Sequence, residues 1–288
     1  MELKESKKAV RESISSARAA GKTIGFVPTM GALHDGHKSL IAASAADCGC
    51  TVVSIFVNPT QFGPGEDFER YPRGLERDLR AAEDAGADLI FAPSAEEIYP
   101  PGFATFVEVG ELGEVLCGAS RPGHFRGAAT VVAKLLNIVR PDVLYLGRKD
   151  AQQAIILTRM ILDLDFDIDV RVLPTVREPD GLAMSSRNRY LSASQRTSAS
   201  LLSAALFSAG ELFESEEREV RQLVAAACSV LGREKKLVVE YFEARDAASL
   251  VEVSRVERKT LLVLAARIGE TRLIDNVLLD PETGTFEK

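Results

Sequence analysis

Residues 26–37 read Phe26-Val27-Pro28-Thr29-Met30-Gly31-Ala32-Leu33-His34-Asp35-Gly36-His37. An apolar run that starts at Thr23 leads into this stretch, and a helical pattern begins at Lys38. A glycine-rich loop between a strand and a helix is a common phosphate site in α/β proteins. The first N–H groups of the helix lack intrahelical partners there, and the helix dipole favours negative charge. The stretch therefore predicts an anion-binding loop at a helix N-terminus.

Two of the three histidines, His34 and His37, lie in this loop, three positions apart. If the helix has begun there, the two imidazoles share one face. Imidazoles can donate hydrogen bonds to phosphate oxygens as negative charge develops on them. The pattern alone leaves a second interpretation open, in which the loop is an ordinary strand-to-helix turn.

Composition restricts the class of protein. A chain of 288 residues exceeds a typical single domain, so we expect two domains or one domain with a large appendage. A net charge of -7 argues against a nucleic-acid partner. No run is long and apolar enough for a membrane span or a signal peptide, and the four cysteines show no disulfide framework. We expect a cytoplasmic protein with reduced thiols and no membrane partner.

A zinc site built from His34, His37, Cys48 and Cys50 can be tested by distance. A continuous helix is expected between His37 and Cys48, which at about 1.5 Å per residue separates the two pairs by roughly 16 Å. Zinc ligands lie about 2.0–2.3 Å from one ion. We therefore predict no protein metal site.

Strand-like and helical patterns alternate through the first 175 residues. Helices are expected at 4–20, 37–47, 74–85, 129–139 and 151–162, and strands at 23–27, 51–57, 88–92, 142–146 and 169–173, with a possible edge strand at 105–109. This alternation predicts a Rossmann-like, doubly wound parallel sheet with right-handed crossovers.

The pattern changes in the last third of the chain. Helices are expected at 193–214 and 216–231, and strands at 237–242, 261–268 and 271–278, the last two joined by the two-residue hairpin loop Gly269-Glu270. We therefore predict a Rossmann-like domain over 1–175 and a smaller C-terminal α+β domain with an antiparallel sheet over 176–288. This second domain is expected to close over the site as a lid.

Polar residues follow several of the predicted strands, at the edge where open α/β sheets bind ligands. Asn58 and Gln61 follow strand 51–57, and their amides suit hydroxyl and carboxylate groups. His124 lies between Arg121 and Arg126 before a helix, which indicates an anion contact. Plain turn chemistry at Asn58-Pro59 and a surface role for His124 remain alternatives.

Two further segments suit phosphate. Lys149 follows strand 142–146 as a point charge, and Asp150 can hold that lysine or a metal-bound nucleotide. Ser185 and Ser186 can donate hydrogen bonds to phosphate, and Arg187 can contact it with its fork. The alternatives are a solvated Lys-Asp pair and a helix cap.

Five motifs in this order closely resemble the pantothenate synthetases, also called pantoate–β-alanine ligases. They are Pro28–His37, Phe56–Phe62, the segment around His124, Gly147–Gln153 and Met184–Asn188. The resemblance spans about residues 20–280 and implies membership of the nucleotidyltransferase superfamily. It also implies a two-step reaction. ATP and (R)-pantoate give pantoyl adenylate and diphosphate, and the amine of β-alanine then displaces AMP to give pantothenate, the vitamin B5 precursor of coenzyme A.

The resemblance implies roles for individual residues. The catalytic residues are His37 as proton donor, His34, Lys149 and Arg187. ATP is contacted by Met30, Gly31, His34, Gly36, His37, Gly147, Lys149, Asp150, Val176, Met184, Ser185, Ser186 and Arg187. The pantoate region contains Gln61, Gln153, Asn58, Tyr71, Arg121 and His124. The resemblance further implies Mg²⁺ held through the ATP phosphates rather than in a protein cage, and a homodimer.

Two residues depart from the family pattern Gly-Glu-Lys-Asp-Tyr/Phe-Gln-Gln. Arg148 replaces the acid, and Ala151 replaces the aromatic residue. We expect these changes to alter nucleotide affinity more than the chemical step.

Three rival classes can be weighed against this assignment. Another adenylyl-transfer enzyme would share the histidine loop but lack the Gln61/Gln153 pair and release no AMP. A non-catalytic nucleotide-binding module would not need the histidines together with Lys149 and Arg187. The short acidic chain disfavours a tRNA synthetase.

Overall fold

The computed structural model describes residues 1–288, which form two compact units. Unit 1 consists of Met1–Gly147 and Ile156–Leu173, and unit 2 consists of Arg148–Ile155 and Pro174–Lys288. The chain therefore enters unit 2 briefly at Arg148, returns to unit 1, and enters unit 2 again at Pro174.

Unit 1 is built on a six-stranded parallel sheet. Its strands are β1 (Glu2–Lys4), β2 (Ile24–Thr29), β3 (Cys50–Ile55), β4 (Leu89–Phe91), β5 (Val143–Gly147) and β6 (Asp169–Leu173), in the order β1-β4-β3-β2-β5-β6. The order reverses direction between β2 and β5, which is the switch point where doubly wound sheets bind ligands. The predicted Rossmann-like sheet is confirmed.

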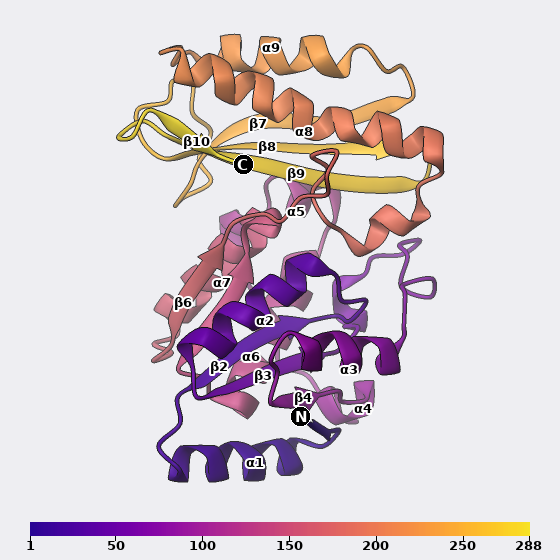
Figure 1. The fold of residues 1–288 in the computed structure, drawn as a ribbon, viewed down its shortest axis with the longest axis vertical. Coiled ribbons are helices and arrows are strands. Elements are labelled where there is room, and N and C mark those ends of the chain that lie inside the picture. The colour runs from indigo at the N-terminus through magenta and orange to yellow at the C-terminus, as the bar shows by residue number, and fades with distance from the viewer. The chain divides into compact units, whose positions relative to one another are not determined.

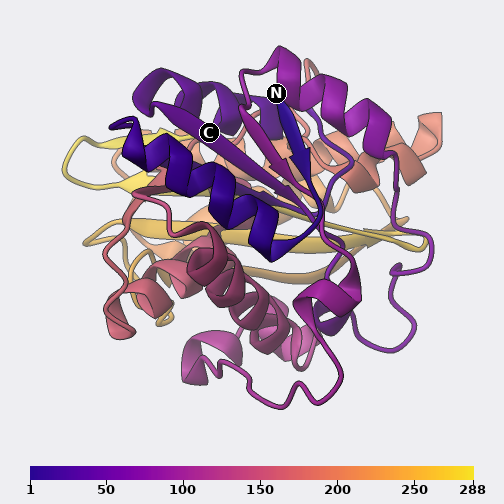
Figure 2. The ribbon, with the colours of Figure 1, turned by 90° about the horizontal axis from the view of Figure 1, so that it is seen from below.

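Helices cover both faces of this sheet (Figure 2). Helices α2 (Asp35–Asp47) and α3 (Leu75–Asp84) pack on one face, and α1 (Lys7–Ala19) and α6 (His124–Val139) pack together on the other. The smaller elements are α4 (Ala95–Ile98), α5 (Cys117–Ser120) and the 3₁₀ helices η1 (Pro59–Gln61) and η2 (Gly110–Gly113). A core cluster under α2 and α3 includes Val27, Ile41, Val53, Ile90 and Tyr145. This cluster packs α2 and α3 onto β2, β3 and β4.

The prediction of an edge strand at 105–109 is wrong. These residues are irregular, and the Val107 N–H donates to Thr130 Oγ1 of α6 at 2.9 Å instead of joining a strand. The edge position belongs to β1, which pairs with β4. Ser6 accepts from the Ala9 N–H as N-cap, so α1 starts at Lys7 and leaves the first residues free to extend.

Strand β2 continues through Pro28 to Thr29, beyond the predicted end at Val27. The Thr29 carbonyl accepts from the Phe56 N–H, so the backbone polar groups of Thr29 point towards β3. Those of the preceding residue, Pro28, point to the other side, towards β5. Pairing with β5 has already ended at Phe26. The missing N–H of Pro28 therefore removes no ladder hydrogen bond.

Unit 2 contains a four-stranded antiparallel sheet with helices on one face (Figure 1). The strands are β7 (Leu237–Asp246), β8 (Thr260–Ile268), β9 (Thr271–Asp280) and β10 (Thr285–Glu287), in the order β10-β9-β8-β7, and the helices are α8 (Ala193–Glu214) and α9 (Val220–Leu231). Ile268 pairs with Thr271 across Gly269-Glu270, so the predicted hairpin is confirmed.

Unit 2 also holds η3 (Arg148–Asp150), η4 (Ser186–Tyr190) and the first residues of α7 (Ala151–Asp163). Both η3 and η4 contact β9. No helix anywhere in the structure is long and apolar enough to span a membrane.

Candidate active site

The two histidines of the opening loop lie together at the start of α2. The helix begins at Asp35 with His34 as N-cap, and the imidazole centroids of His34 and His37 are 4.1 Å apart. The His34 N–H donates to His37 Nδ1 at 3.4 Å. Because Nδ1 of His37 acts as an acceptor, the proton of its neutral ring is on Nε2.

The backbone of this loop is held by two polar side chains. Thr29 Oγ1 accepts from the Gly31 N–H at 3.1 Å, and the Asp78 carboxylate accepts from the Ala32 and Leu33 N–H groups, both at 2.8 Å. Asp78 is only 2% exposed. Gly31 and Ala32 both have positive φ, at 81° and 52°, and a side chain at Ala32 makes this conformation costly. Asp78 thus stabilises a strained loop.

These contacts leave few donors for a ligand. The N–H groups of His37 and Lys38 donate to the His34 carbonyl, at 2.8 and 3.0 Å. The first two helical N–H groups, those of Asp35 and Gly36, have no acceptor in the protein. The anion-binding capacity predicted for the loop is therefore concentrated in these two N–H groups and in the adjacent imidazoles.

A second polar cluster surrounds Gln61. Asn58 Nδ2 donates to Gln61 Oε1 at 3.0 Å and to the Gly127 carbonyl at 3.1 Å. Asn58 Oδ1 accepts from Thr60 and, at 2.8 Å, from the Tyr99 hydroxyl. Asn58 is 1% exposed, and its buried amide links Gln61 to the Gly127 backbone, to Thr60 and to Tyr99.

The side chain of Gln61 lies next to the histidine loop. Its Nε2 donates to Met30 Sδ at 3.1 Å. A thioether sulfur is a weak acceptor, so a ligand oxygen can replace it at little cost. Close approach of α6 allows this arrangement, because a Cβ on Gly127 would lie 2.2 Å from the Thr60 carbonyl oxygen. Gln61 is therefore the member of the cluster with an amide group still available to a ligand.

His124 and Arg121 are linked to the same cluster. His124 Nδ1 lies 2.8 Å from the Gln61 carbonyl, which can only accept, so Nδ1 carries the proton. His124 Nε2 then accepts from Arg121 Nη1 at 3.1 Å. Arg121 also pairs with Glu66, at 2.7 and 2.5 Å. Burial raises the pKa of Glu66, but the Arg121 guanidinium, together with the Gly63 backbone and His124, more than offsets this, so the pKa lies below its ordinary value.

Two further predicted residues lie in unit 1. Tyr71 is 5% exposed and packs edge-on against Phe62, with ring centroids 5.9 Å apart. Gly147 ends β5, next to the switch point of the sheet. Tyr71 thus contributes to the packing of the loop that follows Gln61.

In unit 2, Lys149 and Asp150 form an ion pair within η3, with Nζ and Oδ1 3.2 Å apart. Arg148, which stands where the family pattern has an acid, pairs with Glu287 of β10. Its positive charge therefore has a partner within the unit. Ala151 is buried, and Gln153 is partly buried on the first turn of α7.

The other predicted phosphate-binding residues lie on a short hairpin-like loop. The Met184 N–H donates to the Val176 carbonyl at 3.0 Å, and the Gly181 N–H donates to Glu178, closing the predicted Pro-Asp-Gly turn. Ser185 Oγ accepts from the Arg187 N–H at 3.3 Å. Ser186 is 7% exposed and begins η4.

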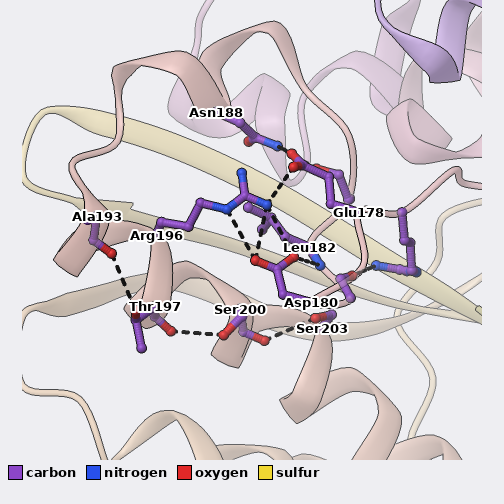
Figure 3. A network of polar contacts seen from close by, with 12 residues as sticks. Glu178, Asp180, Leu182, Asn188, Ala193, Arg196, Thr197, Ser200 and Ser203 are labelled. Atoms are coloured by element: carbon purple, nitrogen blue, oxygen red, sulfur yellow. Dashed lines mark hydrogen bonds and ion pairs between the residues drawn. The ribbon is translucent and has the colours of Figure 1, made fainter.

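A network of polar and charged side chains surrounds the base of this loop at Glu178 and Asp180 (Figure 3). Asn188 Nδ2 donates to Glu178 Oε1 at 2.7 Å, and Arg196 of α8 pairs with both Glu178, at 2.5 Å, and Asp180, at 3.0 Å. Glu178, Asp180 and Arg196 were not predicted from the sequence. The two acids that flank Pro179 in the turn were the only local signal for Glu178 and Asp180, and no local signal indicated Arg196.

The predicted site residues therefore form two groups. Unit 1 brings together the histidine loop and the Gln61 cluster, and unit 2 brings together η3 and the loop of 176–187. No set of three or more His, Cys, Asp or Glu side chains is arranged to hold a metal ion.

Comparison with known proteins identifies the family. The family model described as pantoate-beta-alanine ligase matches residues 2–278. A pantothenate synthetase of Moorella thermoacetica is 51% identical over 280 residues, which cover 97% of this chain and 99% of that protein. Pantothenate synthetase 1 of Bradyrhizobium diazoefficiens is 54% identical over 271 residues, covering 94% and 95%.

Solved structures agree with the sequence matches. The crystal structure of pantothenate synthetase from Thermus thermophilus superimposes with a TM-score of 0.92 at 42% identity, covering 96% of this chain and 98% of that one. The pantoate-beta-alanine ligase of Francisella tularensis, crystallised with beta-gamma ATP and beta-alanine, gives a TM-score of 0.78 at 34% identity, covering 96% and 97%. The fold, the order of the motifs and these matches agree, and the chain belongs to the pantoate–β-alanine ligase family.

Proposed function

We propose that this chain joins (R)-pantoate to β-alanine in two steps driven by ATP. In the first step a pantoate carboxylate oxygen attacks the α-phosphorus of ATP, the bond to the β-phosphate breaks, and diphosphate leaves. In the second step the amine of β-alanine attacks the carbonyl carbon of pantoyl adenylate. The acyl C–O bond breaks, AMP leaves, and the nitrogen loses a proton to give pantothenate.

The observation that carries this proposal is the start of α2. Two N–H groups without a protein acceptor, those of Asp35 and Gly36, lie beside two imidazoles 4.1 Å apart. Donors held in advance can stabilise the charge that develops on the phosphates during displacement. With Nδ1 engaged, His37 offers its Nε2–H to a phosphate oxygen and acts as proton donor. His34 is assigned a neighbouring contact.

The remaining phosphate contacts are assigned to unit 2. Lys149 and Arg187 supply positive charge to the β- and γ-phosphates, and Ser185 and Ser186 donate hydrogen bonds. In-line displacement at phosphorus depends mainly on positioning and charge neutralisation, which suits this set. Met30, Gly31, Gly36, Gly147, Val176 and Met184 are assigned to the nucleotide.

Pantoate is assigned to the Gln61 cluster and to Gln153. Gln61 and Gln153 bind the hydroxyl and carboxylate groups, while Asn58 positions Gln61 and Tyr71, Arg121 and His124 complete the region. The ion pair of Arg121 with Glu66 supports an indirect role for Arg121, since its charge already has a partner.

Mg²⁺ is proposed as a partner of the ATP phosphates. Mg²⁺ usually keeps several waters and binds through substrate phosphates, so the ion is assigned to phosphate and water rather than to a protein cage. The Asp150 carboxylate is half-exposed, and Asp150 is assigned to contact the metal-bound nucleotide.

We further propose a binding domain over 1–175 and a lid domain over 176–288, in a homodimer. The compact unit that begins at Pro174 supports the boundary, although η3 and the first turn of α7 belong to that unit as well. Sedimentation of the purified chain tests the dimer.

The test of the function is diphosphate release with ATP, Mg²⁺ and pantoate, before and after adding β-alanine, with mass spectrometry of the products. We expect one pantoate-dependent burst without the amine, then turnover to pantothenate and AMP with it. Folded protein that binds ATP but releases no pantoate-dependent diphosphate would refute the function.

A further inference from the structure

Two segments of unit 2 that carry predicted phosphate-binding residues contact two neighbouring residues of β9. One segment is η3, with Lys149, and the other is the loop that leads from Val176 to Arg187. The two residues of β9 are Asp275 and Asn276, which are 2% and 3% exposed. Neither has a role in the motifs described above.

Asn276 holds the backbone of η3. Its Nδ2 donates to the carbonyl oxygens of Arg148 and of Lys149, both at 3.0 Å. Two consecutive carbonyl groups bound by one buried amide determine the direction of the backbone on either side of Lys149. The amide of Asn276 thereby determines where the lysine side chain starts.

Asp275 holds the second segment through Arg177. The two side chains form a bidentate pair, with Nη1–Oδ2 and Nη2–Oδ1 distances of 2.7 and 3.0 Å. Arg177 also donates to the carbonyls of Gly181 and Asn276, both at 3.2 Å. Its backbone bridges to Ala183, directly before Met184.

The shape of the guanidinium is essential to this arrangement. One planar fork reaches a carboxylate and two carbonyls, and its face lies 5.0 Å from the Phe207 ring centre. Burial raises the pKa of Asp275, while the charge of Arg177 and the N–H of Asn276 oppose that rise. A buried pair of this kind is strongly destabilised when one partner is removed.

We propose that Arg177, Asp275 and Asn276 are positioning residues that set the distance between Lys149 and the Ser185–Arg187 loop. This inference rests on the proposed function and deepens it. Because both segments are assigned to the β- and γ-phosphates, the three residues act on adenylation. The attack of β-alanine on pantoyl adenylate involves neither phosphate and does not depend on them.

The experiment measures the two half-reactions separately. Pantoate-dependent diphosphate release reports adenylation, and synthetic pantoyl adenylate mixed with β-alanine reports the second step. The variants are Asn276→Leu, which removes the amide but keeps a side chain branched at Cγ, and Arg177→Lys, which keeps the charge opposite Asp275 but loses the planar guanidinium. The control is Asp246→Asn in the same unit. Asp246 is 5% exposed and caps the turn at Ala248 and Ser249, without contact to η3 or the 176–187 loop.

We expect Asn276→Leu to slow adenylation at least about tenfold and to raise the ATP KM, since a shift of about 1 Å can cost about 10²-fold. The second half-reaction should stay within about twofold of wild type. Arg177→Lys should act in the same direction, and its retained charge makes it a test that does not depend on Asn276→Leu folding. Asp246→Asn should lower Tm and leave both half-reactions unchanged.

Two results would overturn the inference. One is unchanged adenylation in Arg177→Lys or in folded Asn276→Leu. The other is an equal loss in both half-reactions, which indicates general damage to unit 2. Absence of diphosphate release in the wild-type chain would instead refute the proposed function itself, so the two failures are distinguishable.

Discussion

Replacing Asp78 by asparagine should loosen the loop that carries His34 and His37. The two carboxylate oxygens of Asp78 each accept one N–H at 2.8 Å, from Ala32 and from Leu33. Asparagine offers a single oxygen, so one of these buried N–H groups would face an NH₂ group. Asp78→Asn keeps the size of the side chain and removes one hydrogen bond together with the charge.

The magnitude follows from these contacts. A hydrogen bond to a charged group contributes about 1.5–3 kcal/mol, and leaving a buried N–H unpaired costs about 1–3 kcal/mol. Because the two terms overlap, the native loop should lose about 2–4 kcal/mol. Its positive-φ alanine already costs about 1–3 kcal/mol, so the loop should leave its native conformation. A loss of about 2.7 kcal/mol corresponds to about 10²-fold in rate.

The assay is pantoate-dependent diphosphate release combined with thermal unfolding. Adenylation should fall by about 10–10²-fold, and Tm should fall by about 5–10 °C, at about 2–4 °C per kcal/mol. The matched control is Asp88→Asn. Asp88 is exposed at the opposite end of the strands, and its carboxylate accepts one hydrogen bond, from the Thr51 N–H at 2.8 Å, which the amide oxygen of asparagine can still accept. We expect the control to resemble wild type in both measurements.

The reasoning is refuted if Asp78→Asn keeps adenylation within about twofold and Tm within about 1 °C of wild type. That result would mean that the loop conformation does not depend on the carboxylate. A fall in Tm without a fall in adenylation would refute the link between loop geometry and chemistry alone.

Three more predictions concern the phosphate-binding residues, Glu66 and the two departures from the family pattern. His34→Ala or Lys149→Ala should lower adenylation at least about 10²-fold, the scale for losing one transition-state donor; near-normal diphosphate release in both variants would contradict their assigned roles. Because the pKa of Glu66 is lowered in the folded chain, its stabilising contribution is present above its ordinary pKa of 4.5 and is lost as pH falls through the lowered value. Urea unfolding from pH 3 to 7 should show that the free energy of unfolding falls less steeply with acidification in Glu66→Gln than in wild type. Identical pH profiles for the two proteins would contradict a stabilising role of the Glu66 carboxylate. Arg148→Glu combined with Ala151→Tyr should change the ATP KM more than kcat in steady-state kinetics; an unchanged KM would remove support for this expectation.

The amino-acid sequence alone was sufficient to predict the architecture of unit 1 and the pattern of unit 2. Continuous β-branched runs, helical spacing and turn residues are local signals, and each is read within about ten residues. The same locality explains the wrong edge strand at 105–109. Its residues alternate like a strand, but a hydrogen bond from Val107 to Thr130 holds the segment against α6.

Local motifs were also sufficient to predict the family and the phosphate-binding character of the histidine loop, Lys149 and Ser185–Arg187. The supporting residues were not. Asp78 under the loop, Tyr99 on Asn58, and the Arg177, Asp275 and Asn276 group come from elements far away in the chain. Nothing in the residues next to Asp78 distinguishes it from the other acids on α3.

The sequence by itself determined which groups could bind phosphate and where strands and helices form. Only the tertiary structure decided which loop N–H groups remain available, which nitrogen of His124 carries its proton, and which carboxylate stabilises the strained turn at Ala32. The physical reason is that a buried polar group must be paired. Its partner is selected by packing across the whole fold rather than by its neighbours in the chain.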